Sequence, residues 1–352
     1  MAFFQCPKCK NKWQHNISKC PDCFLDVKRL KSRKIKVIGI SEIKIPAILH
    51  LKTPYFVLVL EDEQGNRWTQ KSIKEYKIND EFSIKPSHNK KAVSLWKVKY
   101  DILEAIEKTI ELLGGLEINK GSKILILPTL ISAKHPHFAD NTTPEFLEAA
   151  IKFLVQCGAD LKNIKIAGQS FNDVLIEASA QKSQILNIAL KYKIAVLNLA
   201  KTKFIKKEIN GLTVQISEQA FKNDLIINLP KLKLDPQVII KGATNNILTL
   251  LDKKSYLSLK DSNYERVLKK INEVLPEYLS LAEGISIQRS DKIVVSLGLA
   301  FASFNSLNLD RIFAEIAIIK NLPEYLKDIK IEHIPTTGRH PEELQYNVEK
   351  IY

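Results

Sequence analysis

The sequence predicts an α/β protein with a mostly parallel sheet and helices on both faces, preceded by a cysteine-rich ribbon and a small β-barrel. Three observations predict this fold class: four cysteines near the start of the chain, short alternating apolar runs up to about residue 98, and strand-like runs that alternate with helical patterns from residue 100 on. Because 352 residues exceed the usual size of one core, we expect three domains, over residues 1–30, 31–98 and 99–352.

The first element is a cysteine ribbon in CPKCKNKWQHNISKCPDC. Cys6 and Cys9 form one C-x2-C pair, and Cys20 and Cys23 form a second pair ten residues later. Two such pairs let four thiolates converge tetrahedrally on Zn²⁺, which leaves no open position for chemistry. The spacing therefore predicts a structural zinc ribbon, although iron of the rubredoxin type uses the same ligands and stays open as the metal.

The second element is a series of short alternating runs separated by turn residues. They occur at 34–40, 55–62, 66–73 and 81–86. Four or five short strands in this length predict an OB-like β-barrel. A zinc ribbon followed by PYFVLVLEDEQGNRW and INDEFSIK also resembles the ribbon plus OB-fold arrangement of acyl-CoA-associated scaffold proteins. That resemblance implies recruitment of an acyl-CoA enzyme through residues 1–98.

Charge is concentrated in the N-terminal part of the chain. Residues 1–100 hold 21 Lys and Arg against 9 Asp and Glu, a balance of +12 out of the total +14. Clustering of this kind indicates nucleic acid as an alternative partner of residues 1–98, while a solvated lysine-rich surface explains it equally well. No stretch has the length of apolar sequence that a membrane span needs, and the start does not look like a secretory signal. We expect a cytoplasmic protein without a membrane partner.

The third element begins with the amphipathic helix of YDILEAIEKTIELLGG, which ends at Gly114 and Gly115. Strands and helices then alternate. The expected strands are KILILPTLI, KNIKIAGQS, IAVLNL, LTVQISE and DLIINLP, and the expected helices are TTPEFLEAAIKFLVQC and SQILNIALKYK. Thr142 or Thr143 caps the first of these two helices, and Cys157 lies at its end as a small buried residue.

Lysines and amides follow the predicted strand DLIINLP. Lys231, Lys233 and Lys241 come after the carboxyl end of that strand, the edge where open α/β sheets bind ligands. A buried ammonium needs an anionic partner, so these lysines predict a site for a small carboxylate or phosphate, unless they simply extend into solvent. We place the crevice between residues 128–145 and 230–246.

Three further residues would orient the anion. Thr142 and Thr143 lie at a helix N-terminus, where free amides and the helix dipole favour an anion, and Asn245 follows the lysines in GATNN. His135, His137 and Asp140 of KHPHFADNTT could bind a metal or move protons, but a polar loop ahead of the helix is the simpler interpretation. The chain contains neither the GxGxxG nor the GxxxxGK[ST] phosphate-binding pattern.

Five segments resemble a known family in order and spacing. They are GSKILILPTLISAKHP, NTTPEFLEAAIKFLVQCGAD, NDLIINLPKLKLDPQVIIKGATNNILTLL, EGISI and NSLNLDRIFAEIA, and they resemble the domain-of-unknown-function family 362 over about residues 118–320. The resemblance implies an α/β core distantly similar to that of nickel-pincer lactate racemases, and hence a small anionic substrate.

The same resemblance names the candidates for chemistry. Asp310 and Glu283 match acidic positions of the family pattern, so either would be the acid or base if the ligand is turned over. The chain departs from the family at Pro128-Thr129-Leu130, Asp235 and Asn245-Asn246, and it lacks the ferredoxin-type cysteine runs of many relatives. These departures leave open whether the protein is an enzyme.

Overall fold

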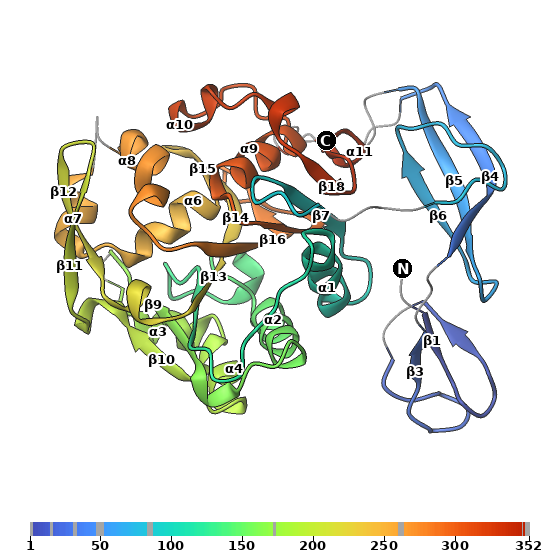
Figure 1. Ribbon diagram of the computed structural model, residues 1–352, viewed down its shortest axis with the longest axis horizontal. Helices are drawn as coiled ribbons and strands as arrows, with labels where there is room; N and C mark the ends of the chain where they lie inside the picture. The colour runs from blue at the N-terminus through green and yellow to red at the C-terminus, as the bar shows by residue number, and fades with distance from the viewer. Residues whose placement is uncertain are drawn as a thin grey trace.

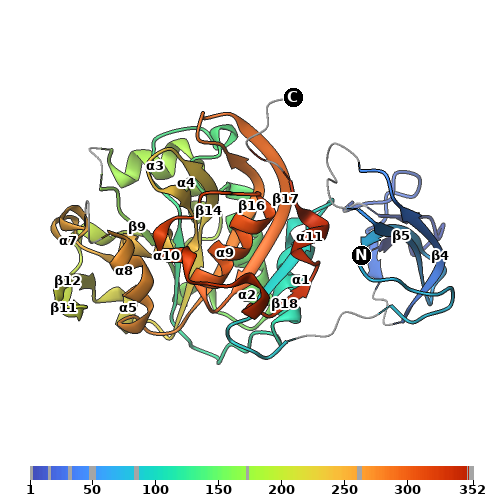
Figure 2. The same cartoon turned by 90° about the horizontal axis from the view of Figure 1, so that it is seen from above.

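The computed structural model describes residues 3–14, 17–30, 34–46, 53–82, 87–171, 174–259, 264–346 and 348. Figure 1 shows a large α/β body, with two smaller β-structures beside it that come from the N-terminal part of the chain. Figure 2 shows the same separation from above. None of the described helices combines the length and the apolar character that crossing a membrane requires.

The body is built on a ten-stranded sheet. Its main path runs β10-β9-β8-β13-β16-β17-β7-β18, and β14 and β15 extend it beside β16. The strands are β7 (Val93–Lys97), β8 (Ile124–Pro128), β9 (Ile164–Gly168), β10 (Ala195–Asn198), β13 (Leu225–Leu229), β14 (Lys231–Asp235), β15 (Ile239–Lys241), β16 (Tyr278–Gln288), β17 (Val294–Ser303) and β18 (Thr336–Gly338).

Neighbouring strands from β10 through β9, β8 and β13 to β16 are parallel. The antiparallel pairs β16–β17 and β17–β7 follow, so the sheet is mixed but mostly parallel, as predicted. The chain first adds β9 and β10 on one side of β8, and later places β13 on the other side. This reversal of direction lies between β8 and β13, and such points open a crevice at the carboxyl ends of the strands.

Helices cover both faces of the sheet, which confirms the predicted class. Along β8, Ile124 and Ile126 enter one hydrophobic cluster, whereas Leu125 and Leu127 enter the other. The first cluster contains α1 (Ile102–Leu112), α2 (Pro144–Gln156), α3 (Ile176–Lys182) and α4 (Ile185–Lys191). The second contains residues of α5 (Gln219–Lys222), α6 (Ala243–Asn246), α8 (Tyr264–Lys270), α9 (Ser306–Ile316) and α10 (Glu324–Lys327). A strand of apolar residues whose side chains point alternately into two hydrophobic clusters is typical of a strand buried on both faces.

The helix ends follow the sequence closely. Asp101 caps α1 by accepting a hydrogen bond from the Leu103 amide, and Thr143 caps α2 by accepting one from the Phe146 amide. Pro144 stands in the first turn of α2, where its missing N–H costs nothing. Cys157 is the C-cap of α2, as predicted, but it is half-buried rather than buried.

The N-terminal part forms two separate antiparallel sheets. The first is β2 (Lys12–Trp13), β1 (Phe3–Gln5) and β3 (Lys28–Leu30). The second is β4 (Ile35–Ile43), β5 (Tyr55–Asp62) and β6 (Arg67–Ser72). Among the described residues the second sheet is open, so a closed OB-like barrel is not observed; most of the strand predicted at 81–86 lies outside those residues.

Other predicted elements differ from the structure. LTVQISE does form a strand, β12 (Leu212–Ser217), but it pairs only with β11 (Phe204–Ile209) in a hairpin outside the large sheet. β7, just before the predicted limit at residue 98, pairs with β17 in the large sheet. Near the C-terminus the described residues contain the short helix α11 (Pro341–Leu344). The remaining described α-helix is α7 (Lys253–Ser258). The domain limits near residues 30 and 98 stay predictions.

Candidate functional site

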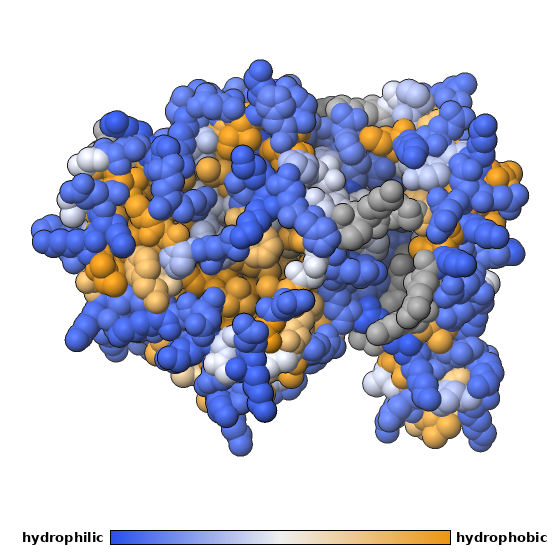
Figure 3. All heavy atoms as spheres, viewed as in Figure 1, coloured by the Kyte–Doolittle hydropathy of each residue, from blue (hydrophilic) through white to orange (hydrophobic). Residues whose placement is uncertain are grey.

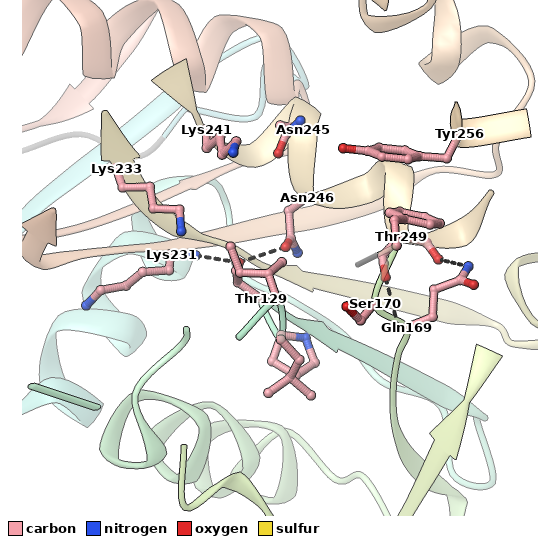
Figure 4. A pocket seen from close by; sticks show the side chains of 15 residues that line it. Thr129, Gln169, Ser170, Lys231, Lys233, Lys241, Asn245, Asn246, Thr249 and Tyr256 are labelled. Atoms are coloured by element: carbon pink, nitrogen blue, oxygen red, sulfur yellow. Dashed lines mark hydrogen bonds between the residues drawn. The ribbon is translucent and has the colours of Figure 1, made fainter. Parts of the chain in front are cut away.

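A pocket of about 110 Å³ opens at the reversal point of the sheet. Its wall combines residues that follow the carboxyl ends of β8 and β9 with residues from β14 to α7 (Figure 4). The lining residues are Pro128, Thr129, Leu130, Ile131, Gln169, Ser170, Phe171, Lys231, Lys233, Lys241, Gly242, Asn245, Asn246, Thr249 and Tyr256. The pocket overlaps the predicted crevice between residues 128–145 and 230–246, and it also includes residues after β9 and Thr249 and Tyr256.

The charged side chains that line the pocket are all lysines: Lys231, Lys233 and Lys241. Lys231 and Lys233 belong to β14, a strand whose five residues are all buried, rather than to the exposed rim that the sequence suggests. Figure 4 shows the ammonium groups of Lys233 and Lys241 among the other lining side chains, whereas the Lys231 ammonium points away from them. The three lysines thus occupy different electrostatic positions.

Lys231 pairs with Glu283 behind the pocket wall. Its Nζ lies 2.5 Å from Glu283 Oε1, and the two side chains are 0% and 1% exposed. The amide of Thr143, at the N-terminus of α2, donates to Glu283 Oε2 at 2.8 Å, and its hydroxyl donates to Oε1 at 3.0 Å. The helix end and the lysine therefore gather around a carboxylate of the chain itself.

Lys233 contacts Asp140, which precedes α2. Its Nζ donates to Asp140 Oδ1 at 3.1 Å and to the Asp140 carbonyl at 3.2 Å. Burial, together with the nearby charge of Lys241, lowers the pKa of Lys233 to about 8, although Asp140 opposes the shift. Burial alone would raise the pKa of Asp140, but Lys233 and Lys134 outweigh it and lower that pKa to about 2.

Lys241 lies at the edge of the pocket. It is the register partner of Lys233 across the antiparallel pair β14–β15, so the two side chains share one face. Its Nζ lies 2.6 Å from Asp235 Oδ2, and 31% of its side chain is exposed. Of the three lysines it is the one that a solute reaches most easily.

Hydrogen bonds between side chains and backbone fix the pocket floor. The Thr129 hydroxyl donates to Asn246 Oδ1 at 2.7 Å and accepts from the Lys231 amide at 2.9 Å. Asn246 Nδ2 donates to the Leu127 carbonyl and to Asn228 Oδ1. These hydrogen bonds join the ends of β8, β13 and β14, so the Asn246 side chain has a structural role.

Two of the predicted orienting residues, Thr142 and Thr143, lie beneath the wall. Thr142 is fully buried, and its Oγ1 donates to the Leu229 carbonyl and accepts from the Thr129 amide. Thr143 is engaged with Glu283, as described above. Asn245 does line the pocket, although its Nδ2 donates to the Tyr264 hydroxyl.

Asp310 lies outside the pocket lining, behind Gly242. It is fully buried, and its two carboxylate oxygens accept from the amides of Ala243 at 2.6 Å and Thr244 at 2.9 Å. Burial raises the pKa of Asp310 to about 6 despite these hydrogen bonds. A Cβ at Gly242 would lie 2.1 Å from Asp310 Oδ1, so only glycine lets the strand pass over this carboxylate.

Several lining residues are absent from the predicted set. Gln169 and Ser170 directly follow β9, and the rule that drew attention to the end of β13 applies equally there. The rings of Phe171 and Tyr256 stack with centroids 3.8 Å apart and an angle of 7°. No sequence pattern joins those two residues, because 84 positions separate them.

A second constellation lies in the N-terminal ribbon. The thiols of Cys6, Cys9, Cys20 and Cys23 lie within 4.8 Å of one another, and the Cys9 and Cys20 sulfurs are 3.6 Å apart. Four sulfurs at about 2.3 Å from a central ion would be roughly 3.8 Å apart, so these residues fit a tetrahedral metal ion.

The backbone repeats the same turn at both cysteine pairs. The amide of Lys10 donates to the Cys6 carbonyl, and the amide of Phe24 donates to the Cys20 carbonyl. Lys10 and Phe24 both have positive φ, 64° and 56°, which brings the following strand back toward the thiols. Two matching turns hold the four sulfurs together and make the group able to hold a metal ion.

The chain was compared with curated proteins, solved structures and family models. No curated protein matches the chain. Among solved structures, the "Ltp2-ChsH2(DUF35) aldolase" is 19% identical with a TM-score of 0.20, and the match covers 29% of this chain and 76% of that chain. The lactate racemase apoprotein from Thermoanaerobacterium thermosaccharolyticum is 13% identical with a TM-score of 0.38, over 64% of this chain and 57% of that one.

A family model gives the firmest match. The model described as "Domain of unknown function (DUF362)" matches residues 124–315, from the start of β8 to the last turn of α9. The matched residues include Lys231, Lys233, Lys241 and their carboxylate partners. Because the match spans more than half of the chain, this protein belongs to the DUF362 family.

Proposed function

We propose that the α/β body binds a small anion, a carboxylate or a phosphate, in the pocket beside Lys233 and Lys241. The observation that carries this proposal is the charge of the wall: Lys233 and Lys241 place their ammonium groups among the lining side chains, the Lys231 ammonium points away, and no acidic side chain is among the described lining residues. The carboxylates that neutralise these lysines, Glu283, Asp140 and Asp235, are outside the lining.

The pocket's composition and size support the same ligand class. Hydroxyl and amide side chains such as Ser170, Asn245 and Tyr256 stand among the lysines and can orient an anion by hydrogen bonds. The pocket volume of about 110 Å³ is several times the roughly 10–15 Å³ of cavity volume that one water molecule requires. A molecule of a few heavy atoms suits it, and a macromolecule does not.

The ribbon has a different role in this proposal. A set of four thiolates closes the coordination shell of Zn²⁺, so the ion would stabilise the fold of the N-terminal segment and would not bind substrate. The same set fits iron, and elemental analysis of the purified protein distinguishes the two.

Isothermal titration calorimetry tests the pocket, with pyruvate, lactate and inorganic phosphate as probes. The Lys241→Gln variant should bind roughly tenfold more weakly, because one charge-assisted contact contributes about 1.5–3 kcal/mol. Lys269→Gln is the matched control: Lys269 pairs with Asp328 at 2.8 Å, and its side chain is 33% exposed, against 31% for Lys241. Equal affinities of the two variants would contradict the proposal.

A specific feature favours nucleic acid as a second candidate partner. A smaller pocket of about 30 Å³ lies between β6 and β7, where Trp68, Trp96 and Tyr100 stand beside Lys97, Lys99 and Arg339. Burial lowers the pKa of both Lys97 and Lys99, and the positive charge of Arg339 adds to that effect. Figure 3 shows predominantly hydrophilic side chains over the N-terminal sheets on the face in view. Aromatic rings beside cations are what single-stranded nucleic acids bind, although Glu104 also lines this pocket and Arg339 pairs with Glu343 at 2.9 Å.

Filter binding across salt concentrations tests this second candidate. A single-stranded oligonucleotide should lose affinity steeply as salt rises, because phosphate contacts release counterions. Lys97→Gln together with Lys99→Gln should flatten that salt dependence, whereas Lys206→Gln together with Lys207→Gln on the distant β11 should not. A weak, salt-independent association would leave only the small-anion proposal.

A further inference from the structure

We propose that Lys233 forms an imine with the carbonyl carbon of a 2-oxo carboxylate held in the pocket, while the Lys241 ammonium pairs with the carboxylate group of that molecule. This inference rests on the proposed anion pocket and names its substrate class. The observations that carry it are the position, the burial and the neighbours of the three lysines.

Two amines face the pocket from adjacent strands. Lys233 and Lys241 are opposite one another in the β14–β15 register, which places their Cβ atoms about 4.5–5.5 Å apart. A 2-oxo acid carries its carbonyl and its carboxylate on neighbouring carbons. One amine can therefore reach the carbonyl carbon while the other contacts the carboxylate.

Lys233 is the lysine placed to act as the nucleophile. The Lys231 ammonium is bound by Glu283 Oε1 and by Ser286 Oγ at 3.1 Å, and it points away from the pocket. The Lys241 ammonium is at the partly exposed edge, paired with Asp235. The Lys233 side chain is 5% exposed and lines the pocket, and among the described residues its ammonium donates hydrogen bonds to Asp140 alone.

Charges on every side act on Lys233. Asp140 favours its ammonium form, while Lys241 and Lys292 disfavour it, and the Lys134 ammonium takes part of the Asp140 charge at 2.6 Å from Oδ2. With burial added, the pKa falls to about 8, so roughly a tenth of Lys233 is free amine at pH 7. A desolvated lysine beside a second cation is a recognised way to prepare a Schiff-base amine.

The reaction balances without an oxidant or a reductant. The lone pair of neutral Lys233 Nζ attacks the carbonyl carbon, and a C–N bond forms as the C=O π electrons move to oxygen. The nitrogen then gives up one proton and the oxygen takes one, which gives a neutral carbinolamine. The carbinolamine hydroxyl takes a second proton and leaves as water while the nitrogen lone pair forms the C=N bond, and the resulting iminium loses its N–H proton to give the imine. The products are one imine and one molecule of water.

Borohydride trapping of the full-length protein with pyruvate tests the imine. Borohydride delivers hydride to the C=N carbon and leaves a stable carboxyethyl group on the lysine, which peptide mass mapping locates. We expect one such group per chain on Lys233, none with lactate, which has no carbonyl group, and none at this position in Lys233→Arg. Lys269→Arg should label as the parent protein does.

The pH dependence of trapping separates Lys233 from ordinary surface lysines. Labelling at Lys233 should rise from pH 7 and level off above about pH 8, whereas labelling of an exposed lysine keeps rising toward pH 10. Labels scattered over exposed lysines, or absent from Lys233, would overturn the imine. If calorimetry still detects pyruvate in that case, only this inference fails; if pyruvate does not bind at all, the anion-pocket proposal fails with it.

Discussion

Replacing Lys231 by methionine should destabilise the protein by about 3 kcal/mol, although the residue lines the candidate pocket. Loss of one partner from a buried ion pair costs about 3–5 kcal/mol, because the other charge stays buried without compensation. Here Glu283 would keep two hydrogen bonds from Thr143, at 2.8 and 3.0 Å, which favours the lower end of that range. Methionine fills most of the volume of the lysine stem, so the packing loss is small.

Urea unfolding followed by far-UV circular dichroism measures this cost. The double variant Lys231→Met with Glu283→Gln should be more stable than the sum of the two single changes predicts, by about 2 kcal/mol, because the second change removes the uncompensated charge. Lys269→Met breaks the exposed Lys269–Asp328 pair and should cost at most about 1 kcal/mol. A cost below about 1 kcal/mol for Lys231→Met, or strict additivity in the double variant, would refute the view that this pair is structural.

Three further outcomes are expected. Gly242→Ala should lower the free energy of unfolding by at least about 2 kcal/mol in the same urea assay, because the new Cβ would lie 2.1 Å from Asp310 Oδ1. Gly168→Ala is the control: its Cβ would have its nearest contact at 3.3 Å, so the change should cost less than about 1 kcal/mol. The pKa of Asp140 is lowered to about 2 in the folded protein, so the Asp140 carboxylate should contribute its full stabilisation above the pKa that Asp140 has in the unfolded chain. That contribution to the free energy of unfolding should be lost as pH falls through about 2, and an acid titration of Asp140→Asn should not show the loss. Inductively coupled plasma mass spectrometry should find about one metal ion per chain, and Cys20→Ser should release it without changing the far-UV spectrum of the α/β body.

Local sequence patterns were sufficient to predict the architecture of the body. A wholly apolar run such as ILILP predicts a strand covered on both faces, and Thr143-Pro144 predicts a helix start, because each depends on neighbouring residues alone. Two C-x2-C pairs likewise fix the cysteine cluster. The paired position of LTVQISE was not predictable, since a strand pattern does not reveal which strand it pairs with.

In the candidate site, too, local sequence predicted some features, whereas pairings between distant residues were not predictable. The order of strands and the rule about strand ends drew attention to the pocket lysines, but not to the buried strand β14 that holds Lys231 and Lys233. The partners of these lysines were not predictable: Glu283 is 52 positions from Lys231, and Asp140 is 93 positions from Lys233. The Lys231–Glu283 pair depends on the register of β14 against β16, in which these two residues are partners, and Asp140 comes from the segment before α2. The sequence therefore indicates that the buried lysines need anionic partners, but it does not reveal that carboxylates of the same chain provide several of those partners.

The positions of Glu283, Asp140 and Asp235 decide whether an anion must break a buried ion pair in order to bind. Glu283 satisfies Lys231 and the α2 terminus behind the wall, so this pair can persist while the pocket fills. Asp140 and Asp235 also lie outside the lining, yet their lysines face the space and can share a second anion without leaving the first. Binding then needs no buried charge to be separated, and the affinity should depend on Lys233 and Lys241. Because Lys241 is partly exposed while Lys233 is nearly buried, added salt should weaken the Lys241 contribution first.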